Sequence, residues 1–182
     1  MTANETIALI ISTLSNMMGQ INYPITVQSA FQPTQQGTQI APFLAVNYVS
    51  GKRYGYPQVT EQVVTDINNG AMSMERTETY WLEEVYQISA YAIVSPNDIN
   101  SPTAYTYATR AAAVLQSAQA RKILLDNGAG FIRISEIRTP FFEDERGRNE
   151  LSPSFDFTVS RQEQLIYSVP IVTALDVNLQ RV

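Results

Sequence analysis

The sequence contains no histidine and no cysteine among its 182 residues. Histidine is the only side chain whose unperturbed pKa lies near neutrality, so its absence removes the usual general base and a common metal ligand. The absence of cysteine excludes thiolate catalysis, cysteine-ligated zinc and disulfide bonds. The two absences together favour a structural protein over an enzyme, and we expect no cofactor.

Charge is also scarce, and lysine above all. Charged residues make up 16% of the chain, the net charge is −5, and Lys52 and Lys122 are the two lysines. Proteins that grip nucleic acid by its phosphates need clustered Lys and Arg, so the composition argues against such binding. Uncharged polar residues cost less to desolvate than charged ones, which suits burial against neighbouring subunits and equally suits a polar surface in water.

Long apolar runs are missing as well. No run of about eighteen apolar residues occurs, and no basic segment precedes the first apolar residues in Met1–Ile11. We therefore expect neither a standard secretion signal nor a membrane span. The length fits one domain over residues 1–182, because no internal repeat or linker divides the chain.

The first residues of the chain carry the sequence signals of a helix N-terminus. Thr2 and Glu5 have capping-box spacing, and apolar residues recur behind them at helical intervals. This pattern predicts a helix over Ala3–Met18 with Gly19 as its stop, and a face of the helix that contacts a core.

A second helix follows a Ser-Pro pair. Ser101 is predicted as its N-cap and Pro102 as its first residue. The helix is alanine-rich, runs to Leu125 and ends at Asp126–Gly128. Its small side chains allow close packing on a sheet.

The segments between the helices are predicted to be extended or looped. Ile21–Gln39 is polar and indicates a loop, and Phe43–Val49 reads as a strand that ends at Ser50–Gly51. Val59–Ile67 is ambiguous between strand and helix, and Asn68–Gly70 indicates a turn.

The remaining strands include unusually long ones. Period-two alternation predicts strands at Arg76–Val94 and Phe155–Pro170, and two further strands are expected at Phe131–Ile137 and Ala174–Gln180. Strands well beyond the usual five or six residues often reach out of their domain to pair with a neighbour. The expected fold is α+β: an antiparallel sheet with long strands, with the N-terminal helix and one alanine-rich helix packed on one face.

The most charged run of the chain could suggest a metal site. Glu143, Asp144 and Glu145 offer the hard oxygen ligands that Mg²⁺ and Ca²⁺ prefer. Their side chains would splay apart in a loop, Arg146 and Arg148 compete for them, and the spacing matches no calcium loop. We expect no metal here, and interpret the run as a charged loop or hairpin tip that lies in solvent or contacts another subunit.

We interpret the other candidate sites as structural. Glu83 and Glu84 are adjacent on a strand, point to opposite faces and cannot act as a catalytic pair, so we expect both at the surface. Gly128 and Gly130 follow a helix, which is the wrong context for a phosphate-binding loop. Trp81 and its tyrosine neighbours are interpreted as core or interface anchors, because no basic groove accompanies them.

Several strings taken together resemble a known family. The opening ETIALIISTLSNM, the strand EEVYQISAYA with the helix SPTAYTYATRAAAVLQSA, and the closing SFDFTVSRQEQLIYSVPIV resemble the tail-terminator or neck proteins of long-tailed bacteriophages. This resemblance implies a compact α+β subunit that closes into a homo-oligomeric ring, typically of six copies. Such a ring caps the tail tube and receives the head connector in the virion, after assembly in the host cytoplasm.

The resemblance also implies partners and surfaces. The partners are further copies of the chain, the tail tube, the head connector and in some tails the sheath, with DNA passing through the lumen and no membrane contact. Trp81, Glu143, Asp144, Glu145, Arg146 and Arg148 are the candidate interface residues. A ring of six would carry about 30 negative charges, which suits a lumen that repels DNA phosphates.

Alternatives remain at this stage. A head-completion or stopper protein, or a minor tail component, would share the same patterns. A small hydrolase or a carbohydrate-binding module would need convergent polar residues in a pocket, and nothing in the sequence spaces Ser, Thr, Asp and Glu for that purpose.

Overall fold

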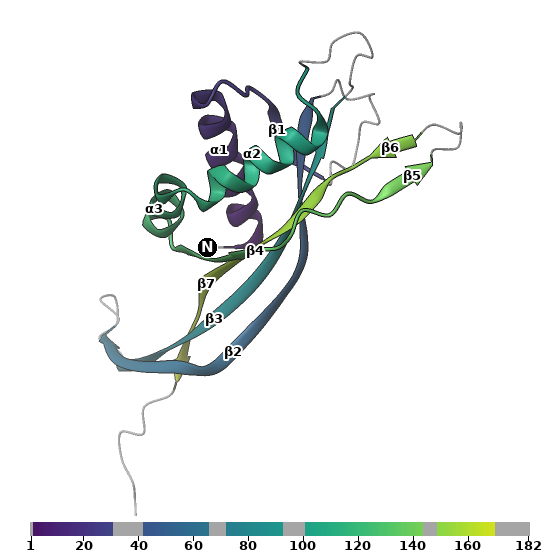
Figure 1. Cartoon of the computed structure of the whole chain (residues 1–182). Coiled ribbons are helices and arrows are strands. Elements are labelled where there is room, and N and C mark those ends of the chain that lie inside the picture. Colours follow the sequence, from purple (N-terminus) through teal and green to yellow (C-terminus); the bar gives the residue numbers. More distant parts are fainter. Residues whose placement is uncertain (1, 31–41, 66–71, 93–100, 144–148, 170–182) are drawn as a thin grey trace, which may run out of the picture.

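The computed structural model describes residues 2–30, 42–65, 72–92, 101–143 and 149–169. In these residues three helices, α1 (Ala3–Gln20), α2 (Ala104–Gln116) and α3 (Ala118–Asp126), lie on one face of a five-stranded sheet (Figure 1). The sheet has the order β1-β2-β3-β7-β4, and β5 and β6 form a separate hairpin. The strands are β1 (Thr26–Ser29), β2 (Phe43–Thr65), β3 (Met72–Tyr91), β4 (Ala129–Ile134), β5 (Phe141–Glu143), β6 (Asn149–Leu151) and β7 (Ser154–Val169).

The predicted α+β class is confirmed, with one refinement of the sheet. All neighbours in the sheet are antiparallel except β1, which runs parallel to β2. The expectation of a loop throughout Ile21–Gln39 was therefore wrong at β1, a short edge strand that pairs Val27 with Leu44. The predicted turn at Asn68–Gly70 and the predicted strand Ala174–Gln180 lie outside the described residues.

The strand β2 does not end where its sequence suggested. Ser50–Gly51 were expected to close it, but β2 continues to Thr65, and the ambiguous segment that begins at Val59 is strand up to that point. Ser50 and Gly51 pair with Val85 and Glu84, and the irregularities of β2 fall at two register shifts, between Tyr48 and Ser50 and between Tyr54 and Gln58. Pairing with β3 before, between and after the two shifts keeps β2 a single strand.

Helix α1 forms as its N-terminal signals predicted. The Thr2 hydroxyl accepts from the Glu5 amide at 3.3 Å, and the Glu5 carboxylate accepts from the Thr2 amide at 2.6 Å. The helix extends past the predicted stop at Gly19 and ends at Gln20. Its inward face buries six side chains: Thr6, Ile10, Thr13, Leu14, Met17 and Met18.

The alanine-rich segment folds as two helices instead of one. Ser117 has extended backbone angles, φ −64° and ψ 151°, which end α2, and its hydroxyl accepts from the Ala120 amide at 3.2 Å to begin α3. The predicted N-cap Ser101 was also wrong, because Thr103 caps α2. The break turns α3 toward β4, against which it packs.

The core lies between the helices and one face of the sheet, which we call the helix-side face. Alternate residues of β3 and β7 point into it, and α2 covers them with alanines. Its largest fully buried apolar members are Tyr86, Phe155, Phe157, Ile10, Leu14, Met18, Leu44, Ile88, Leu115, Leu124 and Val46.

Two glycines are expected to respond with opposite sign to alanine. Gly128 has φ +80°, where a side chain is strained, so Gly128→Ala should cost about 1–2 kcal/mol of unfolding free energy. Gly19 lies in α1 with open space around its Cα, so Gly19→Ala should stabilise by about 0.5–1 kcal/mol. Chemical denaturation of both variants beside the parent measures this. Destabilisation by Gly19→Ala would contradict the assignment of Gly19 to the helix.

Candidate assembly surface

Three strands continue beyond the helices as a projecting arm (Figure 1). We define the arm as Gly51–Thr65 of β2, Met72–Trp81 of β3 and Gln162–Val169 of β7. In β2 every arm residue except Pro57 is exposed. A sheet of three strands with no helix on either face leaves apolar side chains in water on both sides.

Apolar side chains indeed populate both faces of the arm. Met72 and Val63 are 66% and 63% exposed on the face that continues the helix-side face, and Leu165 and Tyr167 share that face. Ile166, 59% exposed, lies on the opposite face, which we call the outer face. Exposed apolar patches of this kind mark interaction sites.

The arm is internally braced across its three strands. Arg53 of β2 lies over the ring of Tyr80 in β3, with its guanidinium carbon 4.7 Å from the centroid, and reaches Glu163 of β7 at 2.6 Å. Because these contacts span the arm from edge to edge, they hold it as one unit.

A second brace lies further along the helix-side face. Glu78 accepts hydrogen bonds from the hydroxyls of Tyr80 at 2.6 Å and Tyr167 at 2.5 Å, and Arg76 lies 3.5 Å away. The Tyr167 hydroxyl, followed by that of Tyr80, lowers the pKa of Glu78, and the same bond raises the pKa of Tyr167.

This brace predicts a pH effect. A carboxyl whose pKa is lowered on folding adds stability above its ordinary pKa and loses it as the pH falls through the folded pKa. Tyr167→Phe removes the hydroxyl that contributes most to lowering the pKa of Glu78. The variant is therefore expected to raise this pKa, as measured by NMR titration. Tyr54→Phe, on the outer face, is the matched control and should leave the Glu78 pKa in place.

A buried polar network stands where the arm meets the core. Glu84 receives the Arg161 guanidinium at 2.8 Å on one oxygen and the Tyr86 hydroxyl at 2.7 Å on the other. The side chains of Arg161 and Glu84 are 6% and 2% exposed. Burial and the bond to Glu84 raise the pKa of Tyr86, and Thr6 of α1 also contacts its hydroxyl. The network therefore joins α1, β3 and β7 at the base of the arm.

The surface role expected for Glu84 was wrong, and that for Glu83 holds only in part. The two acids do point to opposite faces, as predicted, and Glu83 is partly exposed 3.7 Å from both Lys52 and Arg133. Glu84 points inward, where Gly51 gives it room, since a Cβ at Gly51 would lie 3.3 Å from its Cγ.

The whole arm and the helix layer lie within a region that matches a known family. Residues 5–171 match the family of the E217 gateway protein gp29. The chain belongs to this gateway protein family. No curated protein matches the chain.

Membership of the gateway protein family confirms the broad part of the resemblance. The family is one of structural phage proteins of the head-to-tail gateway, so this chain is a structural phage protein. The name agrees equally with a tail terminator and a stopper. The match covers α1 from Glu5 onward and all of β7, so the arm lies within the matched region.

The predicted interface residues are placed unequally in this gateway protein. Trp81 lies on the outer face at the base of the arm, 44% exposed, between Tyr54 and Gln162. Glu143 belongs to the strand β5, which pairs with β6 and confirms a hairpin in the charged run. Asp144, Glu145, Arg146 and Arg148 lie outside the described residues.

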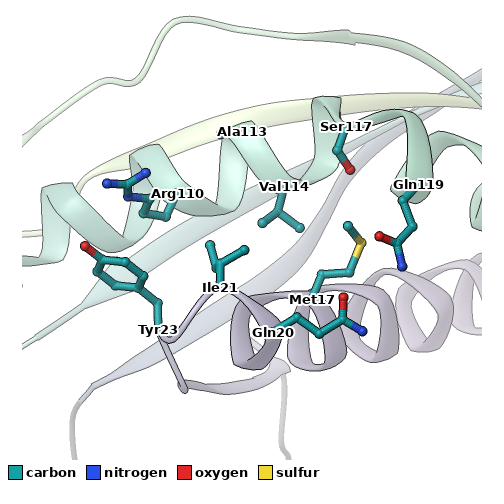
Figure 2. A pocket seen from close by; sticks show the side chains of 9 residues that line it. All are labelled: Met17, Gln20, Ile21, Tyr23, Arg110, Ala113, Val114, Ser117 and Gln119. Atoms are coloured by element: carbon teal, nitrogen blue, oxygen red, sulfur yellow. The ribbon is translucent and has the colours of Figure 1, made fainter.

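A groove of about 510 Å³ lies between α1 and α2 (Figure 2). Met17, Ile21 and Val114 form its apolar floor, and Arg110 stacks over Tyr23 at one end. Its lining residues include no aspartate, glutamate or lysine.

The described residues contain no group of three or more Asp and Glu residues arranged to hold a metal ion. None of their helices is both long and apolar enough to span a membrane.

Proposed function

We propose that this gateway protein forms a ring in the phage neck, of about six copies, that caps the tail tube, joins it to the head connector and so ends tail assembly. The arm is the observation that carries this proposal. A braced sheet with apolar side chains exposed on both faces needs neighbours to cover it, and a second copy of the chain is always available.

The remaining surfaces suit the other partners. The β5–β6 hairpin projects away from the arm (Figure 1) and carries the charged run Glu143, Asp144, Glu145, Arg146 and Arg148. We assign this hairpin to contacts with the tube, the connector or the sheath. Charged residues at a rim set the orientation and specificity of such contacts more than their affinity.

The arm carries a small excess of negative charge. Its residues include Glu61, Glu75, Glu78 and Glu163 against Lys52, Arg53 and Arg76, a net charge of −1. We assign one face of the arm to a lumen through which DNA passes. An acidic wall repels phosphate and lets the genome slide. A ring whose lumen is lined mainly by Arg and Lys would contradict this part of the proposal.

The ring is tested by electron microscopy and sedimentation of the purified chain over a range of concentrations, alone and with assembled tail tubes. Rings of one size, at the ends of tubes when tubes are present, are the expected result. A chain that stays monomeric in both conditions would overturn the proposal. Rings that bind the connector but leave the tube uncapped would instead support the stopper function.

A further inference from the structure

The two outer strands of the arm present edges with few of the features that protect a strand from pairing. The pairing of β1 with β2 ends at Val46, and that of β4 with β7 ends at Arg161. In the described residues, Gln58–Thr65 and Gln162–Val169 therefore have a free backbone edge each. Neither segment contains proline or lysine, which natural proteins often place on exposed edges, and the one acid in each, Glu61 and Glu163, lies beside an arginine of the same arm.

Protection is present elsewhere on the same strand. Nearer the core, β2 carries Lys52 and a bulge that includes Gly55 and Pro57. Bulges and proline discourage pairing with another chain. This contrast within one strand indicates that the edge of Gln58–Thr65 is available for pairing with another chain.

The direction of the strands restricts what these edges can pair with. Both β2 and β7 run antiparallel to β3, so they run parallel to each other. In a cyclic ring every copy has the same orientation relative to the axis, so β7 of one copy meets β2 of the next in parallel. A two-fold dimer would instead join β2 to β2, or β7 to β7, in antiparallel pairs.

The geometry points to a parallel joint in which Gln162–Val169 of one copy pairs with Gln58–Thr65 of the next. This inference rests on the proposed ring, and names the contact that closes it. The two segments are of equal length, and each copy contributes one of each, so the contact is heterologous and repeats around the ring.

The side chains of the two edges are compatible on both faces. Val59 and Leu165 pair with the same residue of β3 from its two sides, as do Val63 and Val169. All four side chains lie on the helix-side face. Thr60 and Ile166 are level on the outer face. Because side chains alternate, the joint can be staggered only by an even number of residues if apolar side chains are to stay on one face.

The joint would make one continuous sheet from all the arms. Three strands from each copy close into a barrel, and closure removes the free edges that the single chain exposes. The lumen of the ring would then be the inside of this barrel.

Cysteine cross-linking tests the joint directly, because the chain has no cysteine of its own. Thr60→Cys is combined in turn with cysteine at each even-numbered position from 162 to 168, which covers every even stagger within the segment. Rings are isolated, oxidised and run on a non-reducing gel. At least one pair is expected to give a ladder that extends to the ring size, since facing strands bring Cα atoms within disulfide range.

Two controls separate the alternatives. Thr60→Cys with Leu165→Cys places the thiols on opposite faces and is expected to give no ladder. Thr60→Cys alone gives dimers only if β2 pairs with β2. Rings without any same-face ladder, or dimers from the single variant, would overturn the parallel joint while leaving the ring standing. The absence of rings themselves, before oxidation, would contradict the proposed function as well.

Discussion

Replacing Glu84 with alanine is expected to lower the free energy of unfolding by about 3–5 kcal/mol, because it leaves the buried Arg161 guanidinium without its carboxylate. The Tyr86 hydroxyl loses its acceptor in the same step. Denaturant unfolding of the monomeric chain, followed by tryptophan fluorescence, measures the loss. Trp81, three residues away on the same strand, reports on this region.

Two matched variants show whether the loss comes from the buried charge. Glu83→Ala removes the neighbouring acid, whose ion pairs with Lys52 and Arg133 are partly exposed, and should cost at most about 1 kcal/mol. The double variant Glu84→Leu with Arg161→Met removes both charges and is expected to recover most of the stability. A double variant as unstable as Glu84→Ala would show that packing, and not the unpaired charge, determines the loss.

The network at the arm base could have been inferred from the sequence. Glu84 falls in the same alternation as Leu82, Tyr86 and Ile88, so a charged side chain stands among core positions. Arg161 does the same after Phe155, Phe157 and Val159. An acid and a base that both break an apolar alternation are a signal for a buried pair, because a buried charge needs a partner.

Local signals predicted the elements that depend on local contacts. The capping box of α1 involves Thr2 and Glu5, three residues apart, and formed as expected. The Asn127–Gly128 end of the helical segment also formed as predicted, with Gly128 at positive φ. Both depend on side chains and backbone groups within one helical turn.

Contacts between residues far apart in the sequence determined the features that the sequence did not predict. Ser50–Gly51 are turn residues by local preference, yet both pair with β3, which keeps the strand intact. Ser117 broke the alanine-rich helix although its neighbours favour one helix, because α3 packs on β4 in a different direction. Of the predicted interface residues, Trp81 lies on the arm. The strand lengths suggested pairing with a neighbour, but which segments have a free edge depends on where β1 and β4 stop pairing, and this is not a local property.

Like charges placed on the two arm edges are expected to prevent assembly. Thr60→Lys with Ile166→Lys puts two cations on the same face at the proposed joint; in a joint without stagger they lie directly opposite each other and destabilise by up to about 1 kcal/mol for each pair. In a ring of six the effect repeats at each joint, for a total of up to about 6 kcal/mol. Sedimentation should show monomers at concentrations where the parent chain forms rings.

The charge reversal separates repulsion at the joint from damage to the arm. Thr60→Lys with Ile166→Glu introduces the same number of charges with opposite signs, so rings should return, and more completely at low salt. Within one copy Thr60 and Ile166 are both paired with Thr77 of β3, on opposite sides of that strand. Any repulsion inside a copy acts across two strand spacings and should leave the unfolding midpoint of the monomer nearly unchanged. If both doubles remain monomeric with intact midpoints, Thr60 and Ile166 are needed in contacts other than a joint between the two edges.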